Sequence, residues 1–405
     1  MSRTAIIALL AGSLIVASAA VAEKKYGPGV TDAEIKIGQT MPYSGPASAN
    51  GNVGRGMAAY FAKVNDDGGV NGRKIRLISL DDAYTPPKTV EQTRKLVEQE
   101  EVLLIFGSLG TAANLAIHKY LNTMKVPQLF ITTGLSKWGD PGNYPWTMGW
   151  EPTRQIEGRI YARYLLTNRP DARIAVLYQN DDYGKDLLNG LKQGLGEKAK
   201  SMIVAEASYE VADPTVDQQI ISLKASGADT LVDISLSRFA AQALRKAHDI
   251  GWKPLHILAY PAASIAQTLK VAGVEKSIGV MTATFVKDPN DPKLANDAGV
   301  RGYFALMQKY LPEADAHDEK FAQGYAQAQT LVQVLKQCGD DLTRENVMRQ
   351  AANLKDLELP ILLPGIRINT SPTDYYPLKQ MQTVRFDGIS WIPVGGILGG
   401  EGVNR

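Results

Sequence analysis

The chain has 405 residues, of which 44% are hydrophobic and 21% are charged, and its formal net charge is +2. This composition is typical of globular proteins, and the length exceeds what one hydrophobic core usually serves, so we expect two domains. A net charge so close to zero offers no electrostatic footprint for nucleic acid or for an anionic membrane. The single cysteine, Cys338, excludes an internal disulfide.

Residues 1–22 are predicted to be a secretory signal. Arg3 precedes an uncharged run rich in Ala, Ile and Leu, and this run ends in Ala-Val-Ala before Glu23, which is the pattern of a cleavage site. A membrane anchor is the alternative reading. Its densely apolar core, residues 5–16, is short of the roughly 18 to 25 residues that a spanning helix needs. We therefore expect an exported protein.

The first predicted unit of the mature chain is a strand, a loop and a helix. Residues 34–38 alternate between apolar and polar, as in a strand, and a loop of small residues follows at 44–51. The helix is predicted from apolar residues that recur on one face of a 3.6-residue period: Val53, Met57, Tyr60, Phe61 and Val64. Glycines at 68–72 end this helix, and apolar alternation at 75–80 begins a second strand.

The same rhythm continues along the chain and then repeats. After Asp82, a helix begins at Thr85, and a further helix from about Thr111 stands between predicted strands at 102–106 and 128–132. A second copy begins near Thr153, with predicted strands at 173–178, 202–207 and 230–234. Helices at about 291–311 and 318–337 and strand-like segments around Val384 and Trp391 follow. Strands that alternate with helices predict two α/β lobes with parallel sheets.

The segment 34–82 resembles the amino-terminal part of periplasmic leucine/isoleucine/valine-binding proteins, the solute receptors of ABC importers, and the resemblance continues across most of the chain. It implies a type I periplasmic binding protein fold, in which two doubly wound parallel-sheet lobes are joined by a three-stranded hinge. The implied lobes are 23–150 with 286–365 and 151–285 with 366–405, with crossings at 148–152, 282–288 and 364–369. The ligand cleft would lie between the lobes.

The resemblance also carries expectations about partners and covalent structure. It implies a periplasmic monomer that delivers a small ligand to an ABC permease in the cytoplasmic membrane and binds no nucleic acid. Relatives often carry a cysteine pair that bridges the loops after the second and third strands. Tyr84 and Gly110 occupy the matching positions here, so both halves of that bridge are absent together.

The first lobe is predicted to bind a carboxylate. Residues 106–114 place a hydroxyl and free backbone N–H groups at a helix start, where the helix dipole also favours an anion. The next strand ends at 131–136 with a second hydroxyl and a glycine. In the resembled receptors the corresponding positions bind the α-carboxylate and amino group of the ligand: Thr111, Ala112, Gly134 and Ser136. The alternative is that Thr111 only caps its helix and Gly134 only turns the chain.

Three further residues are predicted to contact the ligand or to line the cleft. The alternative is that they only pack in the protein interior. The resemblance places a ligand-contacting tyrosine at Tyr183, where an aromatic ring at the cleft mouth can close over a bound molecule. Asn50, in the first loop, and Trp150, just before the first crossing, are further candidates for the cleft lining.

The chain departs from the amino-acid receptors at the ammonium site. Those proteins pair the ligand ammonium with an acidic side chain from the second lobe, but the window 252–267, which holds Tyr260, contains no Asp or Glu. Leaving a buried ammonium unpaired costs roughly 3 to 5 kcal/mol, or about two to three and a half decades of affinity. A second aromatic contact of the family falls on Leu236, with Arg238 close by as a further anion contact. Leu236 and Tyr260 are also candidate ligand-binding residues.

These features predict a cleft without a carboxylate that could hold a positive nitrogen. The predicted ligand is an organic acid that lacks the amine, either aromatic or branched aliphatic. A branched-chain amino acid or amide receptor and a sensing module for a membrane signalling receptor remain the alternatives. An enzyme is not expected, because the four histidines form no metal-binding pattern and no G-x-S-x-G, P-loop or G-x-G-x-x-G motif occurs. No cofactor and no metal are predicted.

Overall fold

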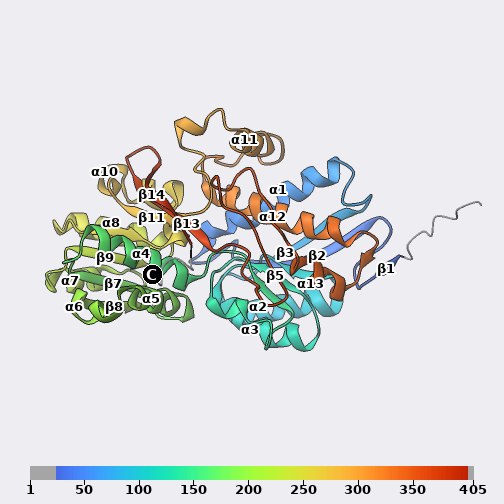
Figure 1. Ribbon diagram of the computed structural model, residues 1–405, viewed down its shortest axis with the longest axis horizontal. Coiled ribbons are helices and arrows are strands. Elements are labelled where there is room, and N and C mark those ends of the chain that lie inside the picture. Colours follow the sequence, from blue (N-terminus) through green and yellow to red (C-terminus); the bar gives the residue numbers. More distant parts are fainter. Residues whose placement is uncertain (1–23, 400–405) are drawn as a thin grey trace, which may run out of the picture.

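The computed structural model describes residues 24–399, which form two α/β lobes lying side by side (Figure 1). The first lobe is built on a five-stranded sheet of order β3-β2-β4-β5-β6, in which all neighbours are parallel. Its strands are β2 (Glu34–Met41), β3 (Lys74–Asp81), β4 (Leu104–Phe106), β5 (Gln128–Ile131) and β6 (Thr147–Gly149). A small parallel pair joins β1 (Lys25–Tyr26) to β12 (Asp341–Leu342). The predicted signal segment, 1–22, lies outside the described residues.

Helices cover both faces of the first sheet (Figure 1). Strand β4 explains why, because its successive side chains point to opposite faces. Phe106 joins the core formed with Met57 and Phe61 of α1, whereas Ile105 joins a separate core with Ile117 of α3. The helices of this lobe are α1 (Asn52–Asp66), α2 (Pro86–Arg94), α3 (Thr111–Thr123), α11 (Ala298–Tyr310), α12 (Glu319–Cys338) and α13 (Arg344–Ala351).

Helix α12, which comes late in the chain, packs closely on α1. Both helices carry a glycine at the contact, Gly56 and Gly324, and a Cβ added to Gly56 would lie 2.9 Å from the Cα of Phe321. Only glycine allows the backbones to approach so closely. This contact brings the amino-terminal end of α12, beginning at Glu319, to the boundary between the lobes.

The second lobe contains a seven-stranded sheet of order β14-β13-β11-β10-β9-β7-β8. Its strands are β7 (Ile174–Gln179), β8 (Ile203–Tyr209), β9 (Thr230–Ile234), β10 (Leu255–Leu258), β11 (Met281–Thr284), β13 (Gln380–Phe386) and β14 (Trp391–Gly399). The five strands β7 to β11 pair in parallel. The predicted α/β fold of two lobes with parallel sheets is therefore confirmed. Strands β13 and β14 add an antiparallel hairpin, whose turn is held by Asp387 accepting hydrogen bonds from the amides of Ile389 and Ser390.

Helices also cover both faces of the second sheet. Ile174 and Val176 of β7 join the core that contains α4 and α5, whereas Ala175 and Leu177 join the core with α7 and α8. The helices are α4 (Arg154–Asn168), α5 (Asp182–Leu195), α6 (Ala199–Met202), α7 (Asp217–Ala225), α8 (Ser237–Asp249), α9 (Lys270–Ala272) and α10 (Val274–Ser277).

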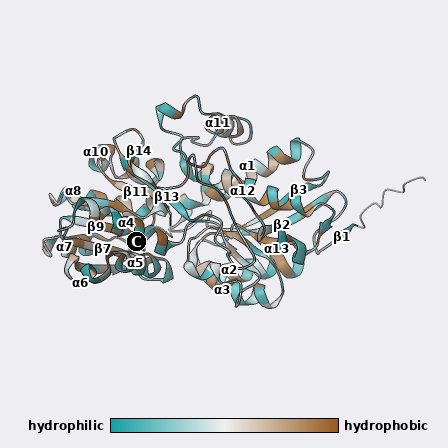
Figure 2. Cartoon of the chain, viewed as in Figure 1, coloured by the Kyte–Doolittle hydropathy of each residue, from teal (hydrophilic) through white to brown (hydrophobic). Residues whose placement is uncertain are grey.

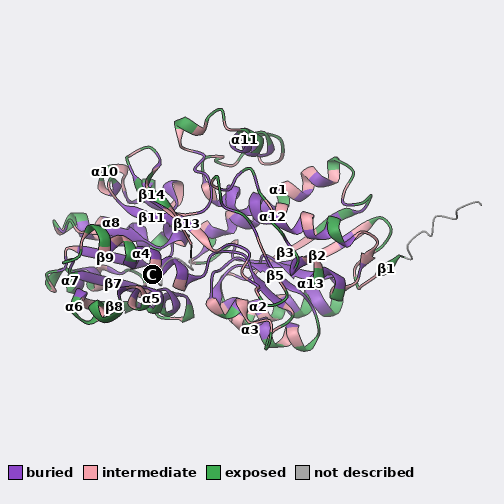
Figure 3. Ribbon diagram, in the orientation of Figure 1, coloured by how far each residue is buried: buried purple, intermediate pink, exposed green. Residues whose placement is uncertain are grey.

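Burial follows this layered arrangement. Figure 3 shows that the strands are mostly buried and that exposed segments lie on the outer helices and loops. In Figure 2 the helices mix hydrophobic and hydrophilic residues, as expected of helices that turn one face to a sheet and the other to water. Among residues 24–399, no helix is long and apolar enough to span a bilayer.

Candidate functional site

A small cavity lies between the two lobes. Its volume is about 40 Å³, enough for only a few water molecules, so the lobes are closed around it. Residues from both lobes, and from the segment where the chain first crosses between them, line the cavity: Asn50, Val53, Tyr84, Leu109, Gly110, Thr111, Thr132, Thr133, Glu151, Arg154, Tyr183, Leu236, Tyr260, Pro261, Lys320 and Gln323.

The first-lobe wall is the start of α3. The Thr111 and Thr133 hydroxyls are 2.6 Å apart and hydrogen-bonded to each other. The first-turn amides of a helix have no intrahelical acceptor, and the helix dipole makes this end positive. Gly110, which precedes α3 with φ +105°, lies against the ring of Tyr84, and an added Cβ would be 2.7 Å from Tyr84 Cε2. The two positions that the resemblance pairs as cysteines therefore lie side by side.

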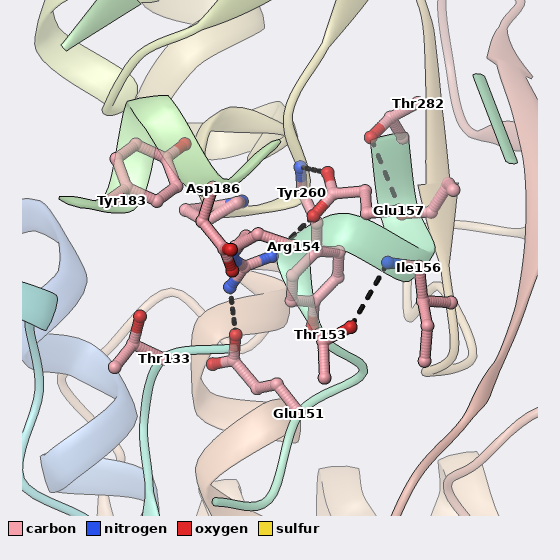
Figure 4. A network of polar contacts seen from close by, with 12 residues as sticks. Thr133, Glu151, Thr153, Arg154, Ile156, Glu157, Tyr183, Asp186, Tyr260 and Thr282 are labelled. Carbon is pink, nitrogen blue, oxygen red and sulfur yellow. Dashed lines mark hydrogen bonds and ion pairs between the residues drawn. The ribbon is translucent and has the colours of Figure 1, made fainter. Parts of the chain in front are cut away.

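A buried ion-pair network forms the floor of the cavity (Figure 4). Arg154 lies between two carboxylates, donating from Nη1 to Glu157 Oε2 at 2.5 Å and from Nη2 to Glu151 Oε2. Glu157 Oε1 also accepts from the Tyr260 amide at 2.6 Å and the Tyr161 hydroxyl at 2.7 Å. Although burial opposes its charge, the two carboxylates raise the pKa of Arg154, while burial raises the pKa of Glu151.

The prediction of a cleft without a carboxylate is wrong, because Glu151 reaches into the cavity. This acid does not come from the second-lobe segment in which the resemblance places the ammonium partner. It comes from the first crossing, directly before α4. Both of its oxygens are already engaged, since Oε2 accepts from Arg154 and Oε1 accepts from Gln323 Nε2 at 2.8 Å.

Lys320 brings a second cation to the cavity from the first turn of α12. Its Nζ donates to the carbonyl of Pro261 at 2.8 Å and lies 5.5 Å from the ring centroid of Tyr260. This contact joins the first lobe to the second. Burial lowers the pKa of Lys320. The Tyr260 ring in turn packs on Phe285, with 4.6 Å between centroids, and its hydroxyl faces Gln323 Oε1 at 3.4 Å.

Five of the ten predicted site residues line this cavity: Asn50, Thr111, Tyr183, Leu236 and Tyr260. Tyr183 lies in the first turn of α5, where its hydroxyl donates to the carbonyl of Ser235 at 3.1 Å. Its ring centroid is 5.7 Å from Arg154 Cζ. Asn50 is buried, and its Oδ1 accepts no hydrogen bond from the residues that the structure describes.

The structure does not bring the other five predicted residues to the cavity lining. Ser136 donates its amide and hydroxyl to Asp186 instead. Gly134 packs under the crossing, and its carbonyl accepts from the Arg154 amide at 2.6 Å. Ala112 belongs to the first turn of α3 but is not among the lining residues.

The side chains of Trp150 and Arg238 contact residues outside the cavity lining. The buried Trp150 donates from Nε1 to Thr330 Oγ1 at 3.0 Å and packs edge-on against Phe285, so its observed contacts are packing contacts. Arg238 is exposed near the start of α8, and its guanidinium donates to the carbonyl of Pro214 at 3.1 Å. It is not among the residues that line the cavity, and it lies instead beside Gly45 and Pro46 of the first lobe.

The residues missed from the sequence are mainly charged. Glu151, Arg154 and Glu157 follow one another at intervals of three, which is the spacing of neighbours on one side of a helix start. That spacing, directly after a predicted crossing, was the available signal. Lys320 and Gln323 carry no such local signal, since a charged first turn is common in long helices. Among residues 24–399, no group of three or more His, Cys, Asp or Glu side chains could hold a metal ion.

Comparison with known proteins identifies the family of this chain. A family model described as periplasmic binding protein matches residues 34–388. Leu/Ile/Val-binding protein homolog 7 of Brucella abortus (strain 2308) is 26% identical over 247 residues, which are 59% of this chain and 61% of the relative. The match therefore covers less than two thirds of that relative.

Two solved structures share the fold. A branched chain amino acid ABC transporter protein from Thermus thermophilus, solved with bound valine, has a TM-score of 0.81 at 16% identity, with 91% of this chain and 97% of that chain covered. A fatty acid ABC transporter substrate-binding protein from Thermomonospora curvata has a TM-score of 0.77 at 22% identity, with 94% and 96% covered. Since the family model spans most of the sequence, the expected resemblance to leucine/isoleucine/valine-binding proteins is confirmed, and this chain belongs to the periplasmic binding protein family.

Proposed function

We propose that this protein is the extracytoplasmic solute-binding receptor of an ABC importer and that it captures a small organic acid lacking an α-ammonium. One observation carries the choice of ligand. The cavity joins two cations, Arg154 and Lys320, to the positive end of α3, while both oxygens of Glu151, the one acid among its lining residues, are already bonded. An incoming carboxylate meets two cations against one acid, whereas an incoming ammonium would have to share the Glu151 carboxylate with Arg154.

The energetic argument follows from the buried pair. An ammonium would compete with Arg154 for the Glu151 carboxylate, and separating a buried ion pair costs roughly 3 to 5 kcal/mol. A carboxylate could instead accept from the first-turn amides of α3 and from the Thr111 hydroxyl. The apolar and aromatic lining, including Val53, Leu236 and Tyr183, suits an aromatic or branched aliphatic body.

The proposed cycle is binding followed by closure. The acid docks on α3 in the open form, and the second lobe then swings over it on three connections, at 148–152, 282–288 and 364–369. We assign residues 23–150 and 286–365 to one moving lobe and 151–285 and 366–405 to the other. The closed form would present a surface from both lobes to a membrane permease, and we propose a periplasmic monomer with no catalytic role, as family members are solute receptors.

Structures with the same fold support an acid as the ligand, and they also support a second candidate. The Thermomonospora curvata structure is that of a fatty acid ABC transporter substrate-binding protein, and a fatty acid has a carboxylate without an α-ammonium. The second candidate is a branched-chain amino acid receptor. It is favoured by the presence of Glu151 in the cavity and by the Thermus thermophilus structure with bound valine.

Calorimetry with matched pairs of ligands separates the two candidates. The acids 3-phenylpropionate, 4-methylpentanoate and 3-methylbutanoate equal phenylalanine, leucine and valine without the amine. We expect at least one acid to bind at least about tenfold tighter than its amino-acid counterpart. Tight leucine or valine binding with no binding of the acids would establish the second candidate and overturn the first. Loss of acid uptake in a deletion strain would separate import from sensing.

A further inference from the structure

A second and larger cavity lies beside the cleft, at the hinge. Its volume is about 210 Å³, and it shares Tyr260 and Lys320 with the cleft cavity. The rest of its lining comes from β11, the crossing segments, the β13–β14 hairpin and the start of α12: Ala263, Thr282, Thr284, Val286, Lys287, Asp288, Asp291, Leu294, Glu319, Leu363, Pro364, Gln382, Val384, Trp391 and Pro393.

Most of this wall is apolar. Val286, Leu363, Val384 and Trp391 face the same space from both lobes. An apolar cavity of about 150 Å³ is large enough to hold benzene, so the hinge cavity has room for a phenyl ring or a branched alkyl group. Burying such a group would stabilise its complex by removing its surface from water.

One polar side chain in this cavity has no partner. Both carboxylate oxygens of Glu319 are buried, and neither accepts a hydrogen bond from residues 24–399. Both oxygens of the adjacent acid, Asp318, have partners: Oδ2 accepts from Asn52 Nδ2 at 2.8 Å, and Oδ1 accepts from the Lys320 amide at 3.1 Å. A buried polar group without a partner costs about 1 to 3 kcal/mol, and more when it is charged.

The charges around Glu319 favour a cationic ligand. Asp288 and Asp291 line the same cavity. Lys287 is neutralised by Asp297, with 2.7 Å between Nζ and Oδ2, and Lys320 turns its Nζ to the Pro261 carbonyl. Neither of the described lysines that line the cavity donates to Glu319, so its oxygens remain available as acceptors.

We propose that the hinge cavity is a second ligand site, which binds a primary amine with a compact apolar body through the Glu319 carboxylate. The ammonium donates to Glu319, and the phenyl or branched alkyl body fills the space between Val286, Val384 and Trp391. This site goes beyond the proposed acid receptor and does not depend on it, because Glu319 does not line the cleft cavity.

The test is calorimetry of the purified protein at about pH 9, where the Glu319 carboxylate has lost its proton and the amines remain charged. The ligands are 2-phenylethylamine and 3-methylbutylamine, with 2-phenylethanol as the uncharged counterpart. We expect one amine to bind with a single site and the alcohol to bind at least about tenfold more weakly, as the loss of a charge-assisted hydrogen bond implies. Glu319→Gln should weaken amine binding by at least the same factor. Glu313→Gln, at an exposed glutamate before α12, should leave it unchanged.

A second variant tests the position of the site. Leu294→Trp, at the half-buried rim of the hinge cavity, should reduce amine binding while acid binding in the cleft persists. The absence of amine binding to the unaltered protein, or equal binding by folded Glu319→Gln, would overturn the proposal. Failure of the acids alone bears only on the cleft, so the two proposals fail separately.

Discussion

Asp186 in α5 accepts hydrogen bonds from both the amide and the hydroxyl of Ser136, at 3.0 and 2.6 Å, and thereby ties the second lobe to the first. Gln155 Nε2 donates to the same carboxylate at 2.8 Å. Ser136 was predicted to bind the ligand, but its donors are used for contact between the lobes. The bonds to Ser136 can form only when the lobes are close, so they stabilise the closed arrangement.

Replacing Asp186 should therefore weaken ligand binding without altering the cavity. A hydrogen bond to a charged group contributes about 1.5 to 3 kcal/mol, so Asp186→Ala should lower affinity about 10- to 100-fold if closure is coupled to binding. Asp182→Ala, at an exposed position on the same helix, is the matched control. Calorimetry measures the affinity and small-angle scattering measures closure. An unchanged affinity would show that this contact forms without contributing to closure.

Lys320→Met should reduce acid binding by about tenfold or more. The variant removes the cation and its bond to the Pro261 carbonyl but keeps the apolar stem of the side chain. Lys336→Met, at an exposed site on the same helix, should have no effect. Equal acid affinity in both variants would exclude Lys320 from the site.

Glu151→Gln should separate the two candidate ligands. The change removes one negative charge but keeps an acceptor for Arg154, which still pairs with Glu157. An acid should then bind about threefold to tenfold tighter, because less negative charge faces it, whereas an amino acid held by Glu151 should bind more weakly. A melting curve checks that the variant remains folded. Weaker binding of every acid would contradict the proposed role of Glu151.

The pH dependence of stability should report the burial of Glu319. Burial, and next the charge of Asp318, raise the pKa of Glu319 to about 8, while Lys320 opposes the shift and Asp288 adds to it. Between about pH 4.3, the usual value of glutamate, and pH 8, the folded protein holds a proton that the unfolded chain has released. Stability therefore falls as pH rises through this window.

Glu319→Gln should remove this dependence. The variant should exceed the unaltered protein in free energy of unfolding by about 1 to 3 kcal/mol at pH 8.5, and the two should be nearly equal at pH 4. Urea denaturation at both values makes the comparison, with Glu313→Gln as the exposed control. A difference of the same size at both pH values would show that the proton is not the cause.

The fold could be read from the sequence because its signals are local. Apolar alternation in β2 and β3 and the helical period of α1 arise within a few residues of one another. The antiparallel hairpin of β13 and β14 was seen only as strand-like segments, since its pairing with β11 joins residues about a hundred positions apart.

The site was harder to predict because its contacts are long-range. Thr111 and Tyr183 could be placed from strand ends and helix starts, where open sheets bind ligands. Ser136 could not, since its partner Asp186 lies on the other lobe. Lys320 reaches Pro261 only because α12 packs on α1, which lies far from it in the sequence. No local sequence pattern predicts that packing.

The contact between Tyr84 and Gly110 bears on how this protein can be made. The Tyr84 ring packs on Gly110 where relatives are expected to carry a disulfide. The only thiol in the sequence, that of Cys338, is buried. Folding of this protein therefore requires no enzyme that forms or rearranges disulfides. Residues 23–405 produced in a reducing host cytoplasm should fold as the exported protein does, and reductant in the buffer should not lower its stability.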